Sequence, residues 1–437
     1  MLTVMIAWFL AVPAWAGLVD IQEVTSPKGI KAWLVNEPSI PFVALELRFQ
    51  GGTSLDAPGK RGAIYLMTGL LEEGAGELDA QAYARELEGL AASISYDASD
   101  DQIGISARFL TENRDAVVDL LKMTIHEPRF DQDAIDRVRG QVISGLRSDE
   151  TDPNSIAGKT LSQMVYGDHP YATEGKGTIP SVSALTRDDI IDAKERVFAR
   201  DRLYVSAVGD ITADELGVML DELLADLPEN SVPLPGKSDL TIPGGTTVVD
   251  FDTPQSVALF VQEGIDRDDP DFFPAYLLNH IIGGGSFESR LMTEVREKRG
   301  LTYGIYSYLL PKDHASLYMG SVASSNDRIA ETIDVVREEW RKAAENGVTA
   351  EELDAAKTYL TGAYPLRFNG NSQIAGIMVG MQMEGLPIDY IATRNDQIEA
   401  VTLDEVNRVA SELLDPVGLH FVVVGQPEGL ESRPLTE

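Results

Sequence analysis

Alternating apolar and polar residues predict a strand close to the start of the chain. The segment Val43–Phe49 places four apolar side chains on one face and Glu46 and Arg48 on the other. Leu203–Ile211 is typical of a buried strand that ends in a turn. Residues at helical spacing predict helices over 62–71, 79–90, 132–148, 156–166, 187–198 and 213–224. Strands and helices that mix without strict alternation indicate an α+β fold with largely antiparallel sheets.

A stretch rich in proline and glycine divides the chain into two parts. Four prolines and three glycines fall between residues 227 and 246. This composition is typical of a linker between domains, and we assign the linker to residues 231–246.

The second part of the chain repeats the pattern of the first. Leu203–Ile211 matches Leu419–Pro427, and Leu185–Asp189 matches Val401–Glu405. The two matches share one offset, since 419 minus 203 and 401 minus 185 both give 216. Ordered matches at a consistent offset indicate duplicated structural units, and convergent use of common strand and helix patterns is the alternative.

Duplication predicts two homologous α/β-sandwich domains at residues 17–230 and 247–437. Each consists of a mostly antiparallel sheet with helices packed on it. Two such domains joined by a linker form a clamshell, and the cleft between them is a natural binding site.

Composition excludes several classes of function. The 437 residues carry a formal net charge of -34, from 70 acidic and 36 basic side chains, so nucleic acid and anionic lipid are not expected partners. The chain has no cysteine, which excludes disulfides, thiolate zinc sites and cysteine nucleophiles.

The first 16 residues are typical of a signal peptide. An apolar run from Leu2 to Val12 is followed by Ala14-Trp15-Ala16, a pattern that fits cleavage before Gly17. No Lys or Arg precedes the run, and a buried N-terminal strand or helix is the alternative. No later segment reaches the roughly 18 apolar residues that a membrane helix needs. We therefore expect an exported, periplasmic protein that does not span the membrane.

Two motifs carry a resemblance to a known family. The second part contains Gly283-Gly-Gly-Ser-Phe-Glu-Ser-Arg-Leu-Met-Thr-Glu-Val-Arg-Glu-Lys-Arg-Gly-Leu-Thr-Tyr303, and the first contains Tyr166-Gly-Asp-His-Pro-Tyr171. Over about residues 20–428 the chain resembles the pitrilysin/insulinase zinc peptidases, in the branch that holds mitochondrial processing peptidase and its bacterial relatives. The resemblance implies the duplicated, two-domain peptidase architecture.

The zinc-binding residues of that family are missing from this chain. Active members carry His-x-x-Glu-His on a helix, where two histidines bind zinc and the Glu is the general base. Counting from the preceding glycine places Tyr65, Thr68 and Gly69 at these positions, and Arg139 where the family has a further Glu ligand. The resemblance therefore implies a chain that binds no metal or other cofactor itself.

Other candidate ligands are scattered. No two of the five histidines lie within five residues of each other. His169 is expected to be structural, and His280 to have a core or capping role. Asp97, Asp100 and Asp101 are expected to be solvated turn residues, because the spacing of a calcium-binding EF-hand is absent.

The resemblance also implies a functional pair in the second part. Arg296 and Tyr303 match the Arg and Tyr with which the family binds substrate and stabilises the transition state. The alternative is a surface Arg with a core Tyr. A glycine-rich segment before this pair is the predicted substrate-binding loop, and it consists of Gly283, Gly284, Gly285 and Ser286.

The family contains heterodimers in which one subunit binds zinc and the other supplies the Arg/Tyr pair. The resemblance thus implies a non-catalytic subunit that clamps a peptide or unfolded-protein substrate, with zinc in the partner subunit. Two alternatives remain open. One is a stand-alone peptide-binding or assembly protein, and the other is an independent enzyme with an unrecognised site.

Overall fold

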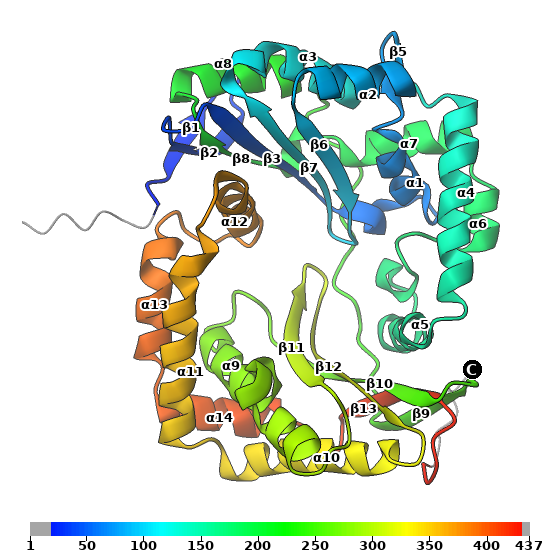
Figure 1. Ribbon diagram of the computed structural model, residues 1–437, viewed down its shortest axis with the longest axis vertical. Helices are drawn as coiled ribbons and strands as arrows, with labels where there is room; N and C mark the ends of the chain where they lie inside the picture. The colour runs from blue at the N-terminus through cyan, green and yellow to red at the C-terminus, as the bar shows by residue number, and fades with distance from the viewer. Residues whose placement is uncertain (1–18, 431–437) are drawn as a thin grey trace, which may run out of the picture.

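The computed structural model describes residues 19–430, so the predicted signal peptide at residues 1–16 lies outside them. The first half of the chain lies above the second in Figure 1, and each half contains one large sheet with helices packed on it. Within the described residues, no helix is long and apolar enough to cross a membrane.

The sheet of the first half has the order β1-β2-β8-β3-β7-β6. Its neighbouring strands are antiparallel except for β2 and β8, which run parallel. The strands are β1 (Gln22–Thr25), β2 (Lys31–Asn36), β3 (Phe42–Gln50), β6 (Ser93–Ala98), β7 (Gln102–Leu110) and β8 (Leu203–Gly209). A separate small sheet joins β4 (Gly74–Ala75) to β5 (Leu78–Asp79).

The sheet of the second half has the order β9-β13-β10-β12-β11, with β9 and β13 as its parallel pair. Strand for strand this repeats β2-β8-β3-β7-β6. The strands are β9 (Gly245–Asp250), β10 (Gln255–Glu263), β11 (Ile305–Lys312), β12 (Ala315–Ser325) and β13 (His420–Gly425). The equal order and the equally placed parallel pair confirm the predicted duplication and the α+β class.

The described part of the first half contains eight α-helices, and α1, α3, α7 and α8 bury apolar residues against one face of its sheet. Their bounds are α1 (Ala63–Leu70), α2 (Ala80–Gly89), α3 (Arg114–His126), α4 (Gln132–Asp149), α5 (Pro153–Tyr166), α6 (Ile179–Ser183), α7 (Arg187–Val197) and α8 (Ala213–Leu224). Residues 225–244 then contain no helix or strand.

In the second half α9, α10, α11 and α14 cover the corresponding face of the other sheet. The helices are α9 (Phe272–Asn279), α10 (Ile329–Asn346), α11 (Ala350–Ala363), α12 (Asn371–Met383), α13 (Tyr390–Ala400) and α14 (Leu403–Leu413). Two short π-helices, η5 (His280–Gly284) and η7 (Met292–Glu297), flank the 3-10 turn η6 (Ser286–Glu288).

Matching helices begin with the same cap in both halves. At the start of α7 the Thr186 backbone N–H donates to Asp189 Oδ2 at 2.8 Å, and at the start of α14 Thr402 N–H donates to Glu405 Oε2 at 2.7 Å. Each Thr hydroxyl in turn accepts the N–H of the acidic residue, which completes a capping box. The two boxes lie at the 216-residue offset noted in the sequence.

The halves exchange one helix each (Figure 1). Helix α5 leaves the first half and packs on the free face of the second sheet, where Leu161 and Val165 join Leu317 and Val422 in a buried apolar cluster. The cap at Asp152, which accepts the Ser155 N–H at 2.8 Å, fixes where α5 begins.

Helix α12 makes the reciprocal contact from the second half onto the first sheet. Ala375 and Met378 of α12 are buried against Ala44 and Val208 of the strands. The Ser206 hydroxyl also donates to the Ala375 carbonyl at 2.7 Å. The two exchanged helices hold the halves together with their free sheet faces turned toward each other.

Candidate functional site

The positions that replace the zinc ligands lie on α1, whose start is fixed by a buried carboxylate. Asp56 accepts the backbone N–H groups of Gly62 and Ile64 at 2.8 and 2.9 Å. Burial raises the pKa of Asp56 to about 6, against the opposing effect of these two bonds. Gly62 has φ 95, and a Cβ atom there would lie 2.8 Å from the Lys176 carbonyl oxygen, so the turn into α1 requires glycine.

None of the three positions on α1 offers a zinc ligand of the usual kind. Tyr65 is 39% exposed, and its phenol is not among the Cys, His, Asp and Glu groups that usually bind Zn²⁺. The Thr68 side chain is buried, and its hydroxyl donates to the Ile64 carbonyl at 2.9 Å. Gly69 has no side chain, and a Cβ atom there would meet Val138 of α4 at 3.2 Å.

Arg139 follows Val138 on α4, so the structure brings the fourth replaced position close to the other three. Its guanidinium donates to Asp136 Oδ1 at 2.7 Å and to the Leu185 carbonyl at 2.8 Å. A cation held here repels Zn²⁺. Within residues 19–430, no group of three or more His, Cys, Asp or Glu side chains converges to hold a metal ion. The residues present therefore do not fit a zinc ion.

The glycine-rich segment of the second half is built for close packing. Gly283 is buried, and a Cβ atom there would collide with Ser307 of β11. A Cβ atom at Gly285 would lie 2.6 Å from the His280 carbonyl oxygen. Gly284 is exposed, and Ser286 begins η6. Within the predicted substrate-binding loop, Gly283 therefore packs in the contact between η5 and β11.

Arg296 and Tyr303 both lie at the protein surface. Arg296 belongs to the π-helix η7, and its guanidinium sits 4.7 Å from the centre of the Phe287 ring. Tyr303 is 90% exposed, so a role as a core tyrosine is excluded. Phe287 is 57% exposed, and the sequence reasoning missed it. Its place within the glycine-rich motif, nine residues before Arg296, was the available signal.

π-Helices are rare and often occur at functional sites. Between residues 19 and 430 there are two of them, and both carry motif residues of the second half: η5 carries Gly283 and η7 carries Arg296. We call Phe287, Arg296 and Tyr303 the exposed Arg/Tyr group.

The acidic loop was misread from the sequence. Asp97 is exposed on β6, but Asp100 pairs with the Lys312 ammonium of the second half, and Asp101 accepts the Tyr171 hydroxyl. Burial raises the pKa of Asp101. The prediction of solvated turn residues is therefore wrong for Asp100 and Asp101, because an ammonium group and a phenol hydroxyl from distant parts of the sequence reach these carboxylates.

His169 belongs to the same region and has the structural role that was predicted. Its Nδ1 accepts the Tyr171 N–H at 3.2 Å, and its Nε2 contacts the Gly236 carbonyl at 3.1 Å. Burial lowers its pKa, and the nearby His314 and Lys312 act in the same direction. We call the following residues the inter-half junction: Asp100, Asp101, His169, Tyr171, Lys312 and His314.

His280 is half-buried and stacks on Tyr359, with 5.1 Å between the ring centres. Burial lowers the pKa of its imidazole. Of the core or capping role that was predicted, the structure shows the cap, because His280 follows the last residue of α9 and its ring packs on the exposed Tyr359.

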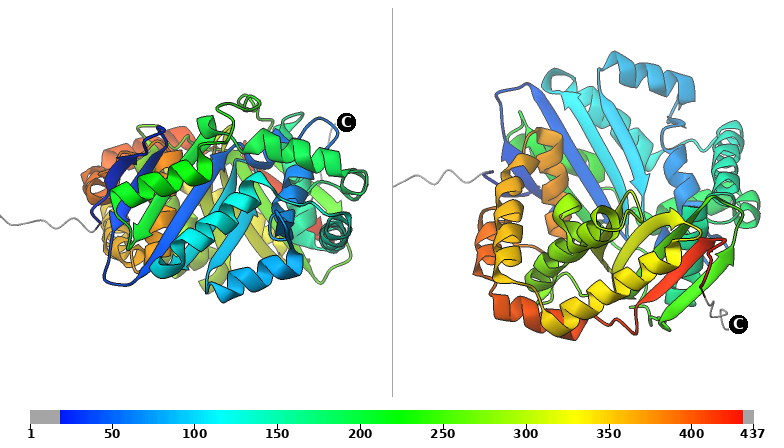
Figure 2. Two further views of the ribbon diagram at one scale, coloured as in Figure 1. Left: turned by 90° about the horizontal axis from the view of Figure 1, so that it is seen from above. Right: turned by 60° about the horizontal axis from the view of Figure 1, so that its bottom comes forward.

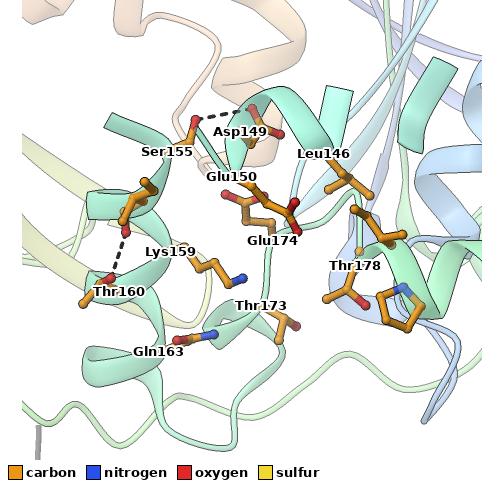
Figure 3. Close-up of a pocket in the computed structure, with 14 residues that line it drawn as sticks. Leu146, Asp149, Glu150, Ser155, Lys159, Thr160, Gln163, Thr173, Glu174 and Thr178 are labelled. Atoms are coloured by element: carbon orange, nitrogen blue, oxygen red, sulfur yellow. Dashed lines mark hydrogen bonds between the residues drawn. The ribbon is translucent and has the colours of Figure 1, made fainter. Parts of the chain in front are cut away.

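A pocket of about 430 Å³ opens in the first half between α4, α5 and α6 (Figure 3). Lys159, Glu150 and Glu174 surround it, and Thr178 lies at its far side in the view. Its lining residues all come from the range 146–180, and none of the predicted site residues is among them.

Comparisons with known proteins identify the family. The family model described as "Insulinase (Peptidase family M16)" matches residues 31–178, and the one described as "Peptidase M16 inactive domain" matches residues 184–360. The non-peptidase homolog YmxG of Helicobacter pylori is 28% identical over 428 residues, which cover 97% of this chain and 98% of that protein. The uncharacterized zinc protease YmxG of Bacillus subtilis is 22% identical and covers 90% of this chain and 95% of its own length.

Solved structures agree with this result. The crystal structure of a peptidase M16 inactive domain from Pseudomonas fluorescens superposes with a TM-score of 0.87 at 29% identity, over 96% of this chain and 100% of that one. A protease from Helicobacter pylori has the same fold, with a TM-score of 0.83 at 17% identity over 93% and 99% of the two chains. The chain belongs to the insulinase family of peptidases, family M16, and is one of its non-catalytic members.

Proposed function

We propose that this chain is the non-catalytic partner subunit of an exported, heterodimeric zinc peptidase. In this proposal the partner subunit holds the zinc ion, which supplies an activated water. This chain clamps the peptide substrate and contributes Arg296 and Tyr303 across the interface. The periplasm is the compartment that the predicted signal peptide implies.

The observation that carries the proposal is the exposure of Tyr303. A tyrosine that is 90% exposed adds nothing to the core of its own domain, and an arginine seven residues earlier lies over another exposed aromatic ring. Aromatic and arginine side chains at a protein surface are typical of binding sites. A guanidinium and a phenol hydroxyl both donate hydrogen bonds, and both stabilise the oxyanion that develops when water attacks a peptide carbonyl.

The edge strand β6 supports the clamping role. It is the outer strand of the first sheet, so one side of its backbone has no neighbouring strand in the described part of the chain. Ser93, Ser95 and Asp97 leave this edge polar and exposed. An extended peptide can add to such an edge through main-chain hydrogen bonds, which bind many sequences alike.

The test uses the assembled complex of this chain with a zinc-binding family member encoded beside its gene. Arg296→Ala and Tyr303→Phe are each introduced into this chain, and kcat/KM is measured on a fluorogenic peptide. Each change removes a donor to the transition state, so we expect a loss of about 10²–10³-fold in the complex.

Two variants of this chain serve as matched controls. Arg299→Ala removes a surface cation that is paired with Glu294, and Tyr359→Phe removes a phenol hydroxyl from a tyrosine outside the motif. Both are expected to leave kcat/KM within about twofold. Equal rates in all five complexes, wild type included, would contradict the proposed role in trans. Failure of the two chains to associate at all would favour the stand-alone binding protein.

A further inference from the structure

A pocket of about 540 Å³ lies in the second half between η8 (Tyr364–Arg367), α12 and α13. It is lined by two arginines, Arg367 and Arg394, together with Tyr364, Tyr390 and Gln373. The lining contains no Asp or Glu. This pocket is separate from the exposed Arg/Tyr group and has no part in the function proposed above.

Arg394 is the unusual residue of this pocket. It is only 5% exposed, yet no carboxylate lies within ion-pair distance among residues 19–430. Its Nη1 donates to the Leu360 carbonyl at 3.2 Å and to Asn395 Oδ1 at 3.0 Å. Buried charges in proteins are normally paired, because an isolated charge in the interior is costly.

The unused side of Arg394 is the side that binds carboxylates. Both hydrogen bonds of its guanidinium come from Nη1, which leaves Nε and Nη2 without a partner in the described part of the chain. These two nitrogens form one edge of the planar group, and their N–H bonds run parallel. That edge matches the two oxygens of a carboxylate. The Tyr364 ring, with its centre 4.2 Å from Arg394 Cζ, holds the guanidinium in place.

A second cation reaches the same space. Arg367 lines the same pocket as Arg394 and Tyr364. Burial, the largest effect, raises the pKa of Tyr364, and the charges of Arg394 and Arg367 oppose this rise. Arg367 is exposed and makes no ion pair with any residue that the structure describes. The chain has 70 acidic residues, yet neither of these two arginines pairs with a carboxylate among the residues that the structure describes. Both are therefore open to an anionic ligand.

The opposite wall of the pocket is kept open by glycine. Gly376 and Gly380 lie one helical turn apart on α12, and a Cβ atom at either position would meet nothing within 4 Å. Glycine inside a helix costs about 1 kcal/mol relative to alanine, and here no steric clash requires it. The two glycines therefore leave room for a ligand at a cost to the stability of the helix.

We propose that this pocket binds a small dicarboxylate, with one carboxylate on the Nε and Nη2 edge of Arg394 and the other on Arg367. Two separate guanidiniums match two carboxylates joined by a short chain. The tyrosine rings and the glycine wall enclose the apolar part of such a molecule. A guanidinium edge binds carboxylate and phosphate alike, so the second arginine and the apolar walls are what distinguish a dicarboxylate from inorganic phosphate in this pocket.

The experiment is calorimetric titration of the purified full chain with glutarate, glutaramide and inorganic phosphate. We expect saturable binding of glutarate only. Arg367→Gln changes an exposed side chain and is expected to weaken binding about tenfold or more, as loss of a charge-assisted hydrogen bond predicts. Gly380→Leu fills the pocket without changing its charge and is expected to abolish binding.

Arg394→Lys keeps the charge but removes the two-donor edge, so it is expected to bind glutarate at least tenfold more weakly. Arg408→Gln serves as the control, because this exposed arginine of the same half is already paired with Asp271 and Glu412, and its binding should equal wild type. Absence of saturable glutarate binding, equal binding of phosphate, or unchanged affinity in Arg367→Gln and Gly380→Leu would each overturn the proposal.

Discussion

The two exchanged helices make equivalent contacts with different chemistry. Ser206 on β8 and Val422 on β13 stand at the 216-residue offset, and each faces the helix that comes from the other half. Val422 packs in an apolar cluster with Leu161 of α5. Ser206 instead donates its hydroxyl hydrogen to the Ala375 carbonyl of α12. One fold position therefore serves as a core contact in one half and as a hydrogen bond in the other.

This difference shows how the two halves are joined. The α5 contact is a buried apolar cluster that joins α5 to β10, β12 and β13, and close packing of that kind changes little without loss of stability. The α12 contact combines a small apolar cluster with two polar bonds, from Ser206 Oγ to the Ala375 carbonyl and from Gln382 Nε2 to the Val205 carbonyl. We infer that α5 anchors the halves and that α12 is the contact more open to adjustment.

The largest effect is expected from Leu161→Ala in α5. Leu161 is 2% exposed in the apolar cluster, so its loss leaves a cavity in a packed layer. Such changes cost about 2–5 kcal/mol, and we expect about 3 kcal/mol off the free energy of unfolding. Urea unfolding followed by circular dichroism measures it. Val218→Ala on α8 is the control, since Val218 is 62% exposed and its loss should change the free energy by no more than about 0.5 kcal/mol.

The next effect comes from giving the second half the residue of the first. Val422→Ser loses two methyl groups and buries a hydroxyl in an apolar cluster, where burial of an unpaired polar group costs about 1–3 kcal/mol. We expect a total loss of about 2–3 kcal/mol in the same urea experiment. Val422→Ala removes the methyl groups without the hydroxyl, so it should cost less. If the serine variant is as stable as the alanine variant, Val422 does not lie in a buried apolar cluster as described above.

The reverse exchange is expected to have a smaller effect. Ser206→Val removes the hydrogen bond to the Ala375 carbonyl and adds apolar surface beside Ala44 and Val208. A neutral hydrogen bond contributes about 1 kcal/mol, and the added burial offsets part of its loss. We expect a net change of about 1 kcal/mol or less in the free energy of unfolding. A loss as large as that of Val422→Ser would remove the distinction between the two contacts.

Local signals predicted most of the fold. The helix predicted over 213–224 is α8 with the same bounds, and the strand predicted at Val43–Phe49 lies within β3. Both were predictable because amphipathic periodicity and capping residues are local signals that act over a few positions. Strand β6 was missed because its sequence, Ser-Ile-Ser-Tyr-Asp-Ala, belongs to an exposed edge with one polar face. Glu46, expected on the opposite face from the core, is nonetheless buried, and it pairs with Arg48 at 2.8 Å on the face turned toward the second half.

The candidate site was predictable only where a motif spans it. Counting from Gly62 assigned the replaced zinc positions, and the family resemblance of the segment from Gly283 to Tyr303 assigned Arg296 and Tyr303. The inter-half junction joins Asp100 to Lys312 across 212 residues, so no local pattern indicates it. The same holds for Arg394, whose missing carboxylate is visible only when its surroundings are known.

The smallest effect concerns pH at the inter-half junction. In the folded chain His169 Nδ1 accepts a hydrogen bond from Tyr171 N–H, so the ring is neutral with its proton on Nε2, and burial lowers its pKa. The unfolded imidazole has its ordinary pKa of about 6.5. Between the lowered folded pKa and this value the unfolded state binds more protons, so stability increases with pH. The contribution is complete above about pH 6.5 and is lost as the pH falls below it.

Urea midpoints at pH 8, 7, 6 and 5.5 measure this dependence. The pKa of Asp56, raised to about 6, stabilises the fold as the pH falls and acts alike in wild type and variants. Against this common background we expect the wild-type midpoint to fall further between pH 7 and 5.5 than that of His169→Gln, because glutamine has no proton to gain. His126→Gln is the control: that ring contacts the Leu223 carbonyl within the first half, so the variant keeps His169 and should keep the wild-type fall. An identical fall in His169→Gln would show that the junction does not sense pH through this residue. A reduced fall would make the junction the acid-sensitive contact between the halves, while the apolar α5 contact stays unaffected by pH.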